Sequence, residues 1–477
     1  GKAEFKAQVP QLRVDLINAQ YDLRSADFGV VLLVAGDDRL AGNEVVNRIN
    51  EWMDARYIQT NVLGELTEEE AMRPRFWRMW RDLPPKGRTS LLAGGVMRIL
   101  RENAEGDLSD EAFTRSLRHL ESLQEALIAE GTLIIKIFLH TPQDKQRKRM
   151  KKAEKNDKTG WRVDQRDWAM LDFLEEEHGK LETLLRRTSV PGSPWTVIEA
   201  TNKRYRDVAV GKTILNAITA RLAETPPETP AVSERLFAPG LRQVTVLDSV
   251  DLSRSLEREA YKKDLNQLQR RLHALSLQAR EQGVSTVLAF EGWDAGGKGG
   301  AIRRVTQSLE AGDYRVIPIA APTEEERRYH YLWRFWRDLP RAGKFVIYDR
   351  TWYGRVLVER VEGFASTAEW QRAYDEINDF EDQLVERGMY VAKFWLHISP
   401  EEQLARFQAR EETPEKQHKI TEEDYRNREK WDDYVQAVDQ MVMRTSSQGA
   451  PWHIIAANDK LAARIEVLEH VTLSLIH

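Results

Sequence analysis

The sequence predicts an α/β protein built from two copies of one domain, each a parallel sheet with helices on both faces. Short apolar runs alternate with stretches of helical periodicity along the chain, which is the pattern of repeated βα units. Long motifs recur at a nearly constant spacing, which indicates duplication. A proline-rich stretch at 223–240 is typical of an extended linker. We therefore expect domains at 1–222 and 241–477.

The duplication is clearest around a motif rich in tryptophan and arginine. WRMWRDLPPKG begins at Trp77, and WRFWRDLPRAG begins 256 positions later at Trp333. Further along, PWTVIEATNK at Pro194 recurs 257 positions later as PWHIIAANDK at Pro451. A slip of one residue over this length indicates a duplicated domain. The tryptophans either pack a helix against the sheet or serve a site, and the sequence favours neither use.

The second copy shows the order of elements most plainly. Apolar runs predict strands at 284–290, 314–320, 344–350, 390–398 and 451–457. Helices are expected at 299–312, around the tryptophan motif, from about 367 to 387, and in the charged region after the fourth strand.

The stretch EGWDAGGKGG, residues 291–300, follows the first of these strands and opens a helix. Its Gly292, Gly297 and Lys298 satisfy the pattern GxxxxGK of phosphate-binding loops. Glycines let backbone N–H groups turn toward phosphate oxygens, the helix N-terminus adds partial positive charge, and the lysine adds a full one. We expect a phosphate site rather than a flexible glycine turn. Its expected loop residues are Gly292, Ala295, Gly296, Gly297 and Gly299.

A metal site is expected beside this loop. The usual loop has Ser or Thr after the lysine as a Mg²⁺ ligand, and Gly299 cannot replace that hydroxyl. A hard cation prefers carboxylate oxygens, which Asp294 in the loop and Asp349 at the end of the strand KFVIYD can supply. Asp349 could instead cap the following helix. With the loop upstream, the sequence favours Asp294 and Asp349 as ligands of Mg²⁺, with Mn²⁺ as the alternative ion.

Cations for the phosphoryl groups are expected in two further places. Arg350 and Arg355 follow the strand directly in DRTWYGR, with Tyr353 between them. Arg406 and Arg410 are spaced to share one face of a helix. Such a pair is most often a solvated face. Because Lys416 and Lys419 follow after a proline break, we favour a lid that closes over phosphates.

Other chemistry finds no support in the sequence. No Ser-His-Asp set or GxSxG motif is present, so acyl transfer is excluded as the expected reaction. His397 lies in an apolar strand and is expected to be a core residue. The absence of cysteine excludes disulfides and thiolate metal sites. With net charge −5, no apolar run near the roughly 20 residues of a membrane span and no signal-like N-terminus, we expect a cytoplasmic protein without nucleic-acid or membrane partners.

The motifs GWDAGGKGG, YDRTWYGR, FWRDLP and PWHIIAANDK together resemble the second, Walker-type family of polyphosphate kinases, in its two-domain branch. The resemblance covers essentially the whole chain. It implies duplicated P-loop kinase domains similar to thymidylate kinase, each with a helical lid. It also implies phosphoryl transfer from inorganic polyphosphate to AMP, giving ADP, with Mg²⁺. The alternatives are transfer to a nucleoside diphosphate, an ATP-dependent nucleoside monophosphate kinase, and a phosphate-binding module without activity.

The resemblance also implies roles for individual residues. Walker-A residues map to Gly292, Asp294, Gly297 and Lys298, the Walker-B pair to Asp349 and Arg350, and the lid to Arg406, Arg410 and the basic residues up to Lys419. One departure concerns the lid, where the family usually has a tryptophan and this sequence has His418 nearby.

The first copy is expected to be silent. Position 298 corresponds to Gly42 and position 349 to Ala93, so this copy keeps Asp38 but lacks both the phosphate lysine and the strand-end carboxylate. Losing a lysine aimed at developing negative charge commonly costs several kcal/mol of transition-state stabilisation. We expect this copy to pack against the second copy, so that one chain forms a pseudo-dimer. The sequence does not decide whether two chains also form a homodimer. Its basic run at 144–155 could bind polyphosphate, although such runs are more often solvated.

Overall fold

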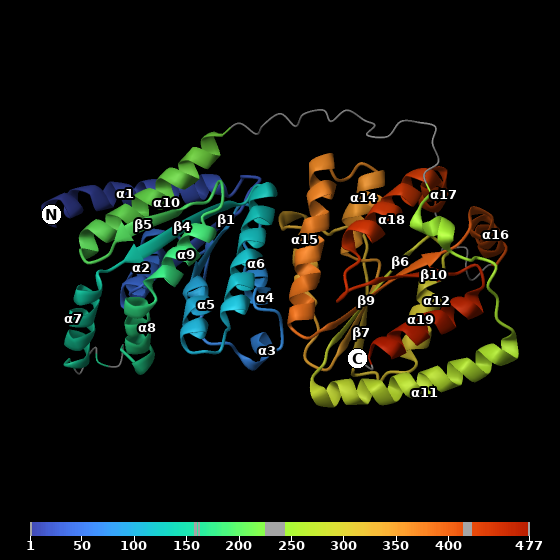
Figure 1. The fold of residues 1–477 in the computed structure, drawn as a ribbon. Coiled ribbons are helices and arrows are strands. Elements are labelled where there is room, and N and C mark those ends of the chain that lie inside the picture. The colour runs from blue at the N-terminus through green and yellow to red at the C-terminus, as the bar shows by residue number, and fades with distance from the viewer. Residues whose placement is uncertain (1, 157–159, 161–162, 225–243, 414–421, 476–477) are drawn as a thin grey trace. The chain divides into compact units, whose positions relative to one another are not determined.

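The computed structural model describes residues 2–156, 160, 163–224, 244–413 and 422–475. It contains two five-stranded sheets whose strand pairs are all parallel (Figure 1). Strand order is β2-β3-β1-β4-β5 in one and β10-β9-β6-β8-β7 in the other, which is the same order read from opposite edges. The predicted duplication of an α/β sheet is confirmed. Most of the expected linker lies outside the described residues.

The described chain falls into two compact units. The first comprises the described residues of 1–67, 76–228 and 322–334, and the second those of 68–75, 229–321 and 335–477. Each unit contains one complete sheet. Each also takes in one short segment from the sequence of the other repeat.

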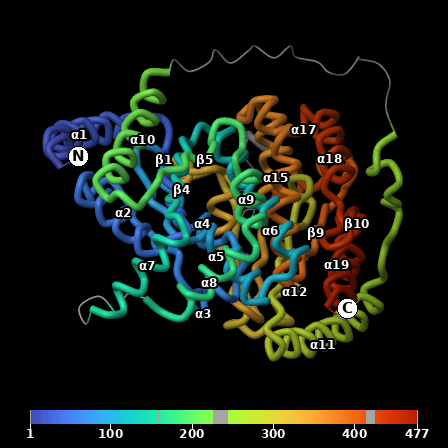
Figure 2. Tube along the Cα trace, turned by 60° about the vertical axis from the view of Figure 1, so that its left-hand side comes forward, coloured from blue at the N-terminus to red at the C-terminus, as the bar shows by residue number. Residues whose placement is uncertain are grey.

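The first unit places its strands between two layers of helices. Its strands are β1 (Val30–Gly36), β2 (Ile58–Val62), β3 (Thr89–Ala93), β4 (Leu133–His140) and β5 (Trp195–Glu199). Its helices are α1 (Lys2–Leu23), α2 (Arg39–Trp52), α4 (Trp77–Arg81), α5 (Gly95–Ala104), α6 (Asp110–Ala129), α7 (Gln143–Glu154), α8 (Gln165–Glu176), α9 (His178–Arg187) and α10 (Lys203–Ala223). Helices α1 and α10 lie side by side (Figures 1 and 2) and cover one face together with α2. Helices α5 and α6 cover the other.

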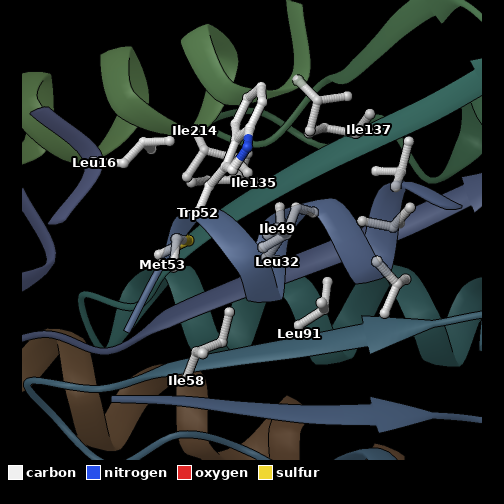
Figure 3. Packing of buried hydrophobic residues seen from close by; sticks show 14 of the residues in the cluster. Leu16, Leu32, Ile49, Trp52, Met53, Ile58, Leu91, Ile135, Ile137 and Ile214 are labelled. Atoms are coloured by element: carbon white, nitrogen blue, oxygen red, sulfur yellow. The ribbon is translucent and has the colours of Figure 1, made fainter. Parts of the chain in front are cut away.

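The core of this unit lies between the sheet and the layer of α1, α2 and α10. Strand β1 is buried along most of its length because helices cover both of its faces. Figure 3 shows Trp52 of α2 and Ile214 of α10 gathered beside Ile135 of β4. Apolar contacts of this kind fix the helices on the sheet and leave the ends of the strands to carry polar groups.

The second unit repeats the plan. Its strands are β6 (Thr286–Gly292), β7 (Tyr314–Pro318), β8 (Phe345–Asp349), β9 (Tyr390–His397) and β10 (Trp452–Ala456). Its main helices are α11 (Arg258–Gln282), α12 (Lys298–Thr306), α15 (Thr367–Glu386), α16 (Pro400–Glu411), α17 (Glu422–Glu429), α18 (Trp431–Thr445) and α19 (Lys460–Ser474). Shorter elements are α3 (Glu68–Ala71), η2 (Val246–Ser249), η4 (Trp352–Val356) and α14 (Val358–Val361). Strand β6 lies in the centre, between β8 and β9.

The predicted strands and the long helix α15 are confirmed, and two expected helices are shorter than predicted. Helix α12 ends at Thr306 instead of 312. The carbonyl of Ser308 accepts a hydrogen bond from His273 of α11 at 3.1 Å, which takes this carbonyl out of a helical ladder. The tryptophan motif forms only the short helix α13 (Trp333–Arg337), and Trp336 is buried against Phe380, so it serves packing.

No helix among the described residues combines the length and the apolar character that crossing a bilayer requires.

Candidate active site

The glycine-rich loop connects the central strand β6 to helix α12. Gly292 ends the strand with φ +148, and a Cβ there would lie 2.7 Å from the carbonyl oxygen of Leu396. No other residue fits this close approach to β9. Gly297 precedes the helix with φ +107, another conformation that favours glycine. The loop therefore has the strand, turn and helix N-terminus that phosphate binding requires.

Two non-glycine residues of the second unit adopt left-handed backbone conformations, and both lie at this edge of the sheet. They are Ala295 in the loop, with φ +61, and Arg350 after β8, with φ +64. Such conformations persist only where the surroundings impose them, and they cluster at functional sites. The position of Arg350 is occupied in the first copy by Gly94, with φ +86.

The lysine of the motif lies over its own loop. Lys298 Nζ donates a hydrogen bond to the carbonyl oxygen of Gly292 at 2.8 Å and another to that of Trp293 at 3.4 Å. Both partners are neutral, so the ammonium charge is not cancelled by these contacts. The charge is therefore held at the mouth of the loop, where an anion can compete for it.

Asp294 joins three elements at the loop. One carboxylate oxygen lies 3.0 Å from a guanidinium nitrogen of Arg350, and the other accepts a hydrogen bond from Asn427 of α17 at 3.1 Å. Its main-chain carbonyl accepts from Gln403 of α16 at 3.1 Å. Because these partners come from three separate segments, the position of Asp294 depends on the tertiary fold.

Asp349 lies at the carboxyl end of β8, next to β6, where its backbone pairs in register with Phe290. It does not cap the following helix, because the side chain of Thr351 caps η4 by accepting from Tyr353 N–H. Within the described residues its carboxylate has no hydrogen-bond or ion-pair partner. A half-buried carboxylate in this state is suited to bind a ligand or a cation.

The oxygen donors at this edge fit a hard cation. Asp294 and Asp349 both follow from the carboxyl ends of adjacent central strands, and Arg350 links the two by sequence and by its ion pair. No cluster of three or more acidic or histidine ligands occurs in the described part of the chain. A cation here would take the remaining ligands from phosphate oxygens and water, as Mg²⁺ usually does.

Arg406 is an anchor for the loop and lies in the interior. It is only 5% exposed, and it donates to the carbonyl oxygens of Ala295 at 2.9 Å, Ala457 at 2.6 Å and Asn458 at 2.8 Å. Burial lowers the pKa of its guanidinium, against the opposing effect of Glu402 at 2.6 Å. The sequence placed Arg406 in a lid that closes over phosphates, whereas in the structure its guanidinium donates to main-chain carbonyls around the loop.

Further cations surround this arginine, and the sequence did not single them out. Burial lowers the pKa of Lys460, and the charges of Arg406, Arg464 and Arg410 lower it further. A Cβ at Gly300 of α12 would lie 3.2 Å from a guanidinium nitrogen of Arg464. The first turn of α12 therefore faces cations from α16 and α19. The sequence gave little indication that Lys460 and Arg464 belong to the site, because only folding brings α19 beside α12.

The remaining predicted residues divide into two groups. Tyr353 is fully buried, and its hydroxyl donates to Glu381 at 2.7 Å, so it is a core residue and is withdrawn as a phosphate ligand. Arg355 is 9% exposed and lies 3.2 Å from Glu359. Lys416, His418 and Lys419 lie outside the described residues.

Trp293 fixes the other side of the loop. Its ring stacks on Trp431 with centroids 3.6 Å apart, and its indole N–H donates to Nδ1 of His397 at 3.0 Å. Burial lowers the pKa of His397 to about 4, so the ring is neutral and can accept this bond. The expectation of a core histidine at 397 is confirmed.

The corresponding loop of the first copy has been replaced by helix. Helix α2 begins at Arg39, three positions before Gly42, which is the counterpart of Lys298. The side chain of Asp38 caps this helix by accepting from Ala41 N–H at 3.1 Å. Asp38 also pairs with Arg149 at 3.0 Å. The protein's own carboxylate thus occupies the helix N-terminus that binds phosphate in a P-loop.

Comparisons with known proteins place the whole chain in one family. The sequence profile of the family described as Polyphosphate kinase 2 (PPK2) matches twice, over residues 1–226 and 255–476. A relative from Pseudomonas aeruginosa named polyphosphate:AMP phosphotransferase is 44% identical over 98% of this chain and 95% of its own. One of the same name from Acinetobacter johnsonii is 35% identical over 97% of this chain and 95% of its own.

A crystal structure of a polyphosphate kinase 2 from Pseudomonas aeruginosa superposes with a TM-score of 0.87 at 41% identity, covering 100% of this chain and 96% of that one. The match therefore spans both copies of the domain. With its duplicated sheet and these matches, the chain belongs to the polyphosphate kinase 2 family.

Proposed function

We propose that this chain transfers the terminal phosphoryl group of inorganic polyphosphate to AMP and releases ADP. The observation that carries the proposal is the loop of the second unit, where Arg350 pairs with Asp294, and Lys298 and Asp349 lie on adjoining segments at the same edge of the sheet. The relatives that span nearly the whole chain are named for this reaction. As a phosphotransferase of this family, the chain needs no nucleophile of its own.

The reaction requires positioning and charge neutralisation. A phosphate oxygen of AMP attacks the terminal phosphorus of the polymer, and the bond from that phosphorus to the bridging oxygen breaks. The shortened polymer leaves with that oxygen. We propose that the loop N–H groups and Lys298 hold the terminal phosphates, and that Arg350 faces the charge that develops during transfer. Arg410, Lys460 and Arg464 supply a basic lane for the rest of the polymer.

A divalent cation completes this account, and we propose Mg²⁺, with Mn²⁺ as the alternative. Asp294 and Asp349 would hold it, and when bound it would neutralise charge on the phosphate oxygens. Arg350 and Asn427 orient the carboxylate of Asp294. Gly299 has no hydroxyl to serve as the usual cation ligand, so we propose that the cation needs both Asp294 and Asp349.

We further propose that catalysis lies within 241–477 and that 1–222 is non-catalytic. Asp38, which is the counterpart of Asp294, serves as a helix cap and ion-pair partner. Gly42 and Ala93 supply neither the lysine nor the strand-end carboxylate. The pairing of the two copies as a pseudo-dimer stays a prediction.

The proposal is tested by offering AMP, ADP or GMP together with either polyphosphate or ATP and Mg²⁺, and by following the nucleotide products. We expect ADP from AMP and polyphosphate. ADP formed only when ATP is the donor would show an ATP-dependent monophosphate kinase. Turnover of ADP but not AMP would show a diphosphate kinase, and no turnover with any pair would favour a binding module.

A further inference from the structure

The first unit has a cleft at the carboxyl edge of its sheet. Its volume is about 820 Å³, and its lining includes Val62, Thr141 and Thr201, which end or follow β2, β4 and β5. Ligands of open α/β sheets bind at the carboxyl ends of the strands. The cleft is therefore where a P-loop kinase domain binds substrates, although the loop itself has become helix.

Most of the charged residues that line the cleft are basic. Five cations line it, and they come from α2, α7 and α10, while one carboxylate, Glu44, lines it as well. Those cations are Arg39, Lys145, Arg149, Lys152 and Lys203. The three on α7 are spaced by four and three residues, which places them along one helix face. Basic residues thus outnumber acidic ones in the lining, although Asp38, Asp144 and Asp167 pair with three of them from beside it.

Several of these cations pair with carboxylates: Arg39 with Asp167 at 2.6 Å, Arg149 with Asp38 at 3.0 Å, and Lys145 with Asp144 at 4.0 Å. Glu44 is shared by Lys203 at 2.6 Å, Arg149 at 3.0 Å and Arg206 at 3.0 Å. Burial alone would raise the pKa of Glu44, and these cations outweigh it, so the pKa is lowered and the carboxyl stays ionised. Lys152 has no carboxylate within 4.0 Å in the described ranges.

The corresponding helix of the second copy lacks this charge. Helix α7 carries six basic and two acidic residues, a net +4, whereas α16 carries two basic and three acidic residues, a net −1. At the 257-residue spacing, Lys145 replaces Glu402 and Lys152 replaces Ala409. Helix α7 of the copy without the phosphate lysine is thus more basic than its counterpart α16. Like charges gathered on one wall repel one another, and an anionic ligand relieves that cost.

The shape and lining indicate which anion. None of the described residues that line the cleft is aromatic, so they offer no ring on which a nucleotide base would stack. A row of lysines and arginines along a helix face suits a linear polyanion. We propose that this cleft binds inorganic polyphosphate without reacting with it. The identity of the polymer rests on the proposed function, and the absence of reaction follows from the helix capped by Asp38.

Such a site would change how the enzyme uses long polymers. A chain held on the first unit keeps its ends at a raised effective concentration for the catalytic site of the same molecule. An oligophosphate too short to bridge the two sites gains nothing from the first one. The site should therefore lower the KM for long polyphosphate and leave kcat unchanged.

The test compares two double variants of the full chain. Lys145→Ala/Lys152→Ala removes two charges that line the cleft, and Lys148→Ala/Lys151→Ala removes two from exposed positions of the same helix that do not line it. Each is titrated with long-chain polyphosphate, with tripolyphosphate and with AMP by calorimetry, and the KM for each donor is measured. Thermal unfolding of both variants checks that they fold.

We expect the cleft pair to weaken long-chain binding and to raise its KM about tenfold, and the control pair to change both by less than about twofold. Equal losses in the two variants would overturn the proposal, since only general electrostatics would then be at work. A loss confined to AMP would make the cleft a nucleotide site and overturn it as well. If the wild type forms no ADP from polyphosphate, the proposed function fails, while the titrations still report on the cleft.

Discussion

Arg350 and Asp294 form an ion pair in which a guanidinium nitrogen lies 3.0 Å from a carboxylate oxygen. The pair ties the segment after β8 to the loop after β6. Arg350 does this from a left-handed backbone conformation, φ +64, which the first copy fills with Gly94. A strained arginine in one copy and a relaxed glycine in the other indicate that the second copy retains the strain for its function.

Replacing Arg350 by glycine should separate stability from activity. Glycine adopts the left-handed conformation at this position without strain, and this gain offsets the loss of the half-exposed ion pair with Asp294. The free energy of unfolding should therefore change by less than about 1 kcal/mol. kcat should fall by about 10²-fold or more, because a cation facing the transferred group is lost. Denaturant unfolding and steady-state kinetics measure the two quantities.

Arg350→Lys serves as the matched control, since it keeps the charge and the strain but lacks the planar fork. We expect an intermediate kcat. If glycine left kcat near the wild-type value, the arginine would have only a structural role at the loop.

Gly299→Ser restores the hydroxyl that most P-loops have, and it should be tolerated. A Cβ at this position meets no atom within 4 Å, so the side chain fits without displacement. Because two aspartates are proposed to hold the cation, kcat should stay within about threefold, whereas Asp349→Asn should lower it about 10²-fold or more. Kinetics over a Mg²⁺ titration measures this. A large gain from the serine would show that the cation lacks a ligand in the natural sequence.

A buried lysine is present in both copies, but its environment differs. Lys393 lies 2.6 Å from Glu381 in the interior, whereas its counterpart Lys136 bonds to the neutral Gln124. Lys393→Met should therefore cost about 3–5 kcal/mol, because it leaves a carboxylate buried and unpaired, and Lys136→Met should cost much less. Denaturant unfolding of the two variants measures the difference. Equal costs would show that the glutamate adds nothing to the interior.

The buried Lys136 of the first copy predicts that stability depends on pH. Burial lowers the pKa of Lys136 from 10.5 to about 7. Between these two values the unfolded chain binds the proton and the folded chain does not, so stability should rise with pH across this window. Lys136→Met should remove that rise, which amounts to a few kcal/mol at most. Unfolding free energies from pH 7 to 10 measure it, and parallel curves for wild type and variant would refute this assignment.

Local patterns in the sequence predicted the parts of this molecule that local chemistry determines. Apolar runs gave the strands, and the glycines of the loop predicted the turn, because Gly292 leaves no room for a side chain beside β9. The duplication followed from spacing alone. Helix α12 was predicted too long because its end depends on a contact with His273 from another helix.

The roles that the sequence missed all depend on contacts between distant segments. Arg406 resembled a surface arginine in the sequence, and only the fold shows that it anchors Ala295 and Asn458. Lys460 ends the motif PWHIIAANDK and Arg464 lies just beyond it, but the sequence assigned neither to the site, which they join because α19 packs beside α12. Asp38 matched a catalytic residue by position, whereas the altered loop makes it a helix cap.

The most direct test of this account compares Lys298→Ala with Asp38→Asn in ADP formation from AMP and polyphosphate. The asparagine can still cap α2 while losing its charge, so this variant isolates any catalytic contribution of the first copy. Lys298→Ala should lower kcat about 10³-fold, and Asp38→Asn should leave it within about twofold. Similar losses in both variants, or full activity without the lysine, would contradict a catalytic centre confined to the second unit.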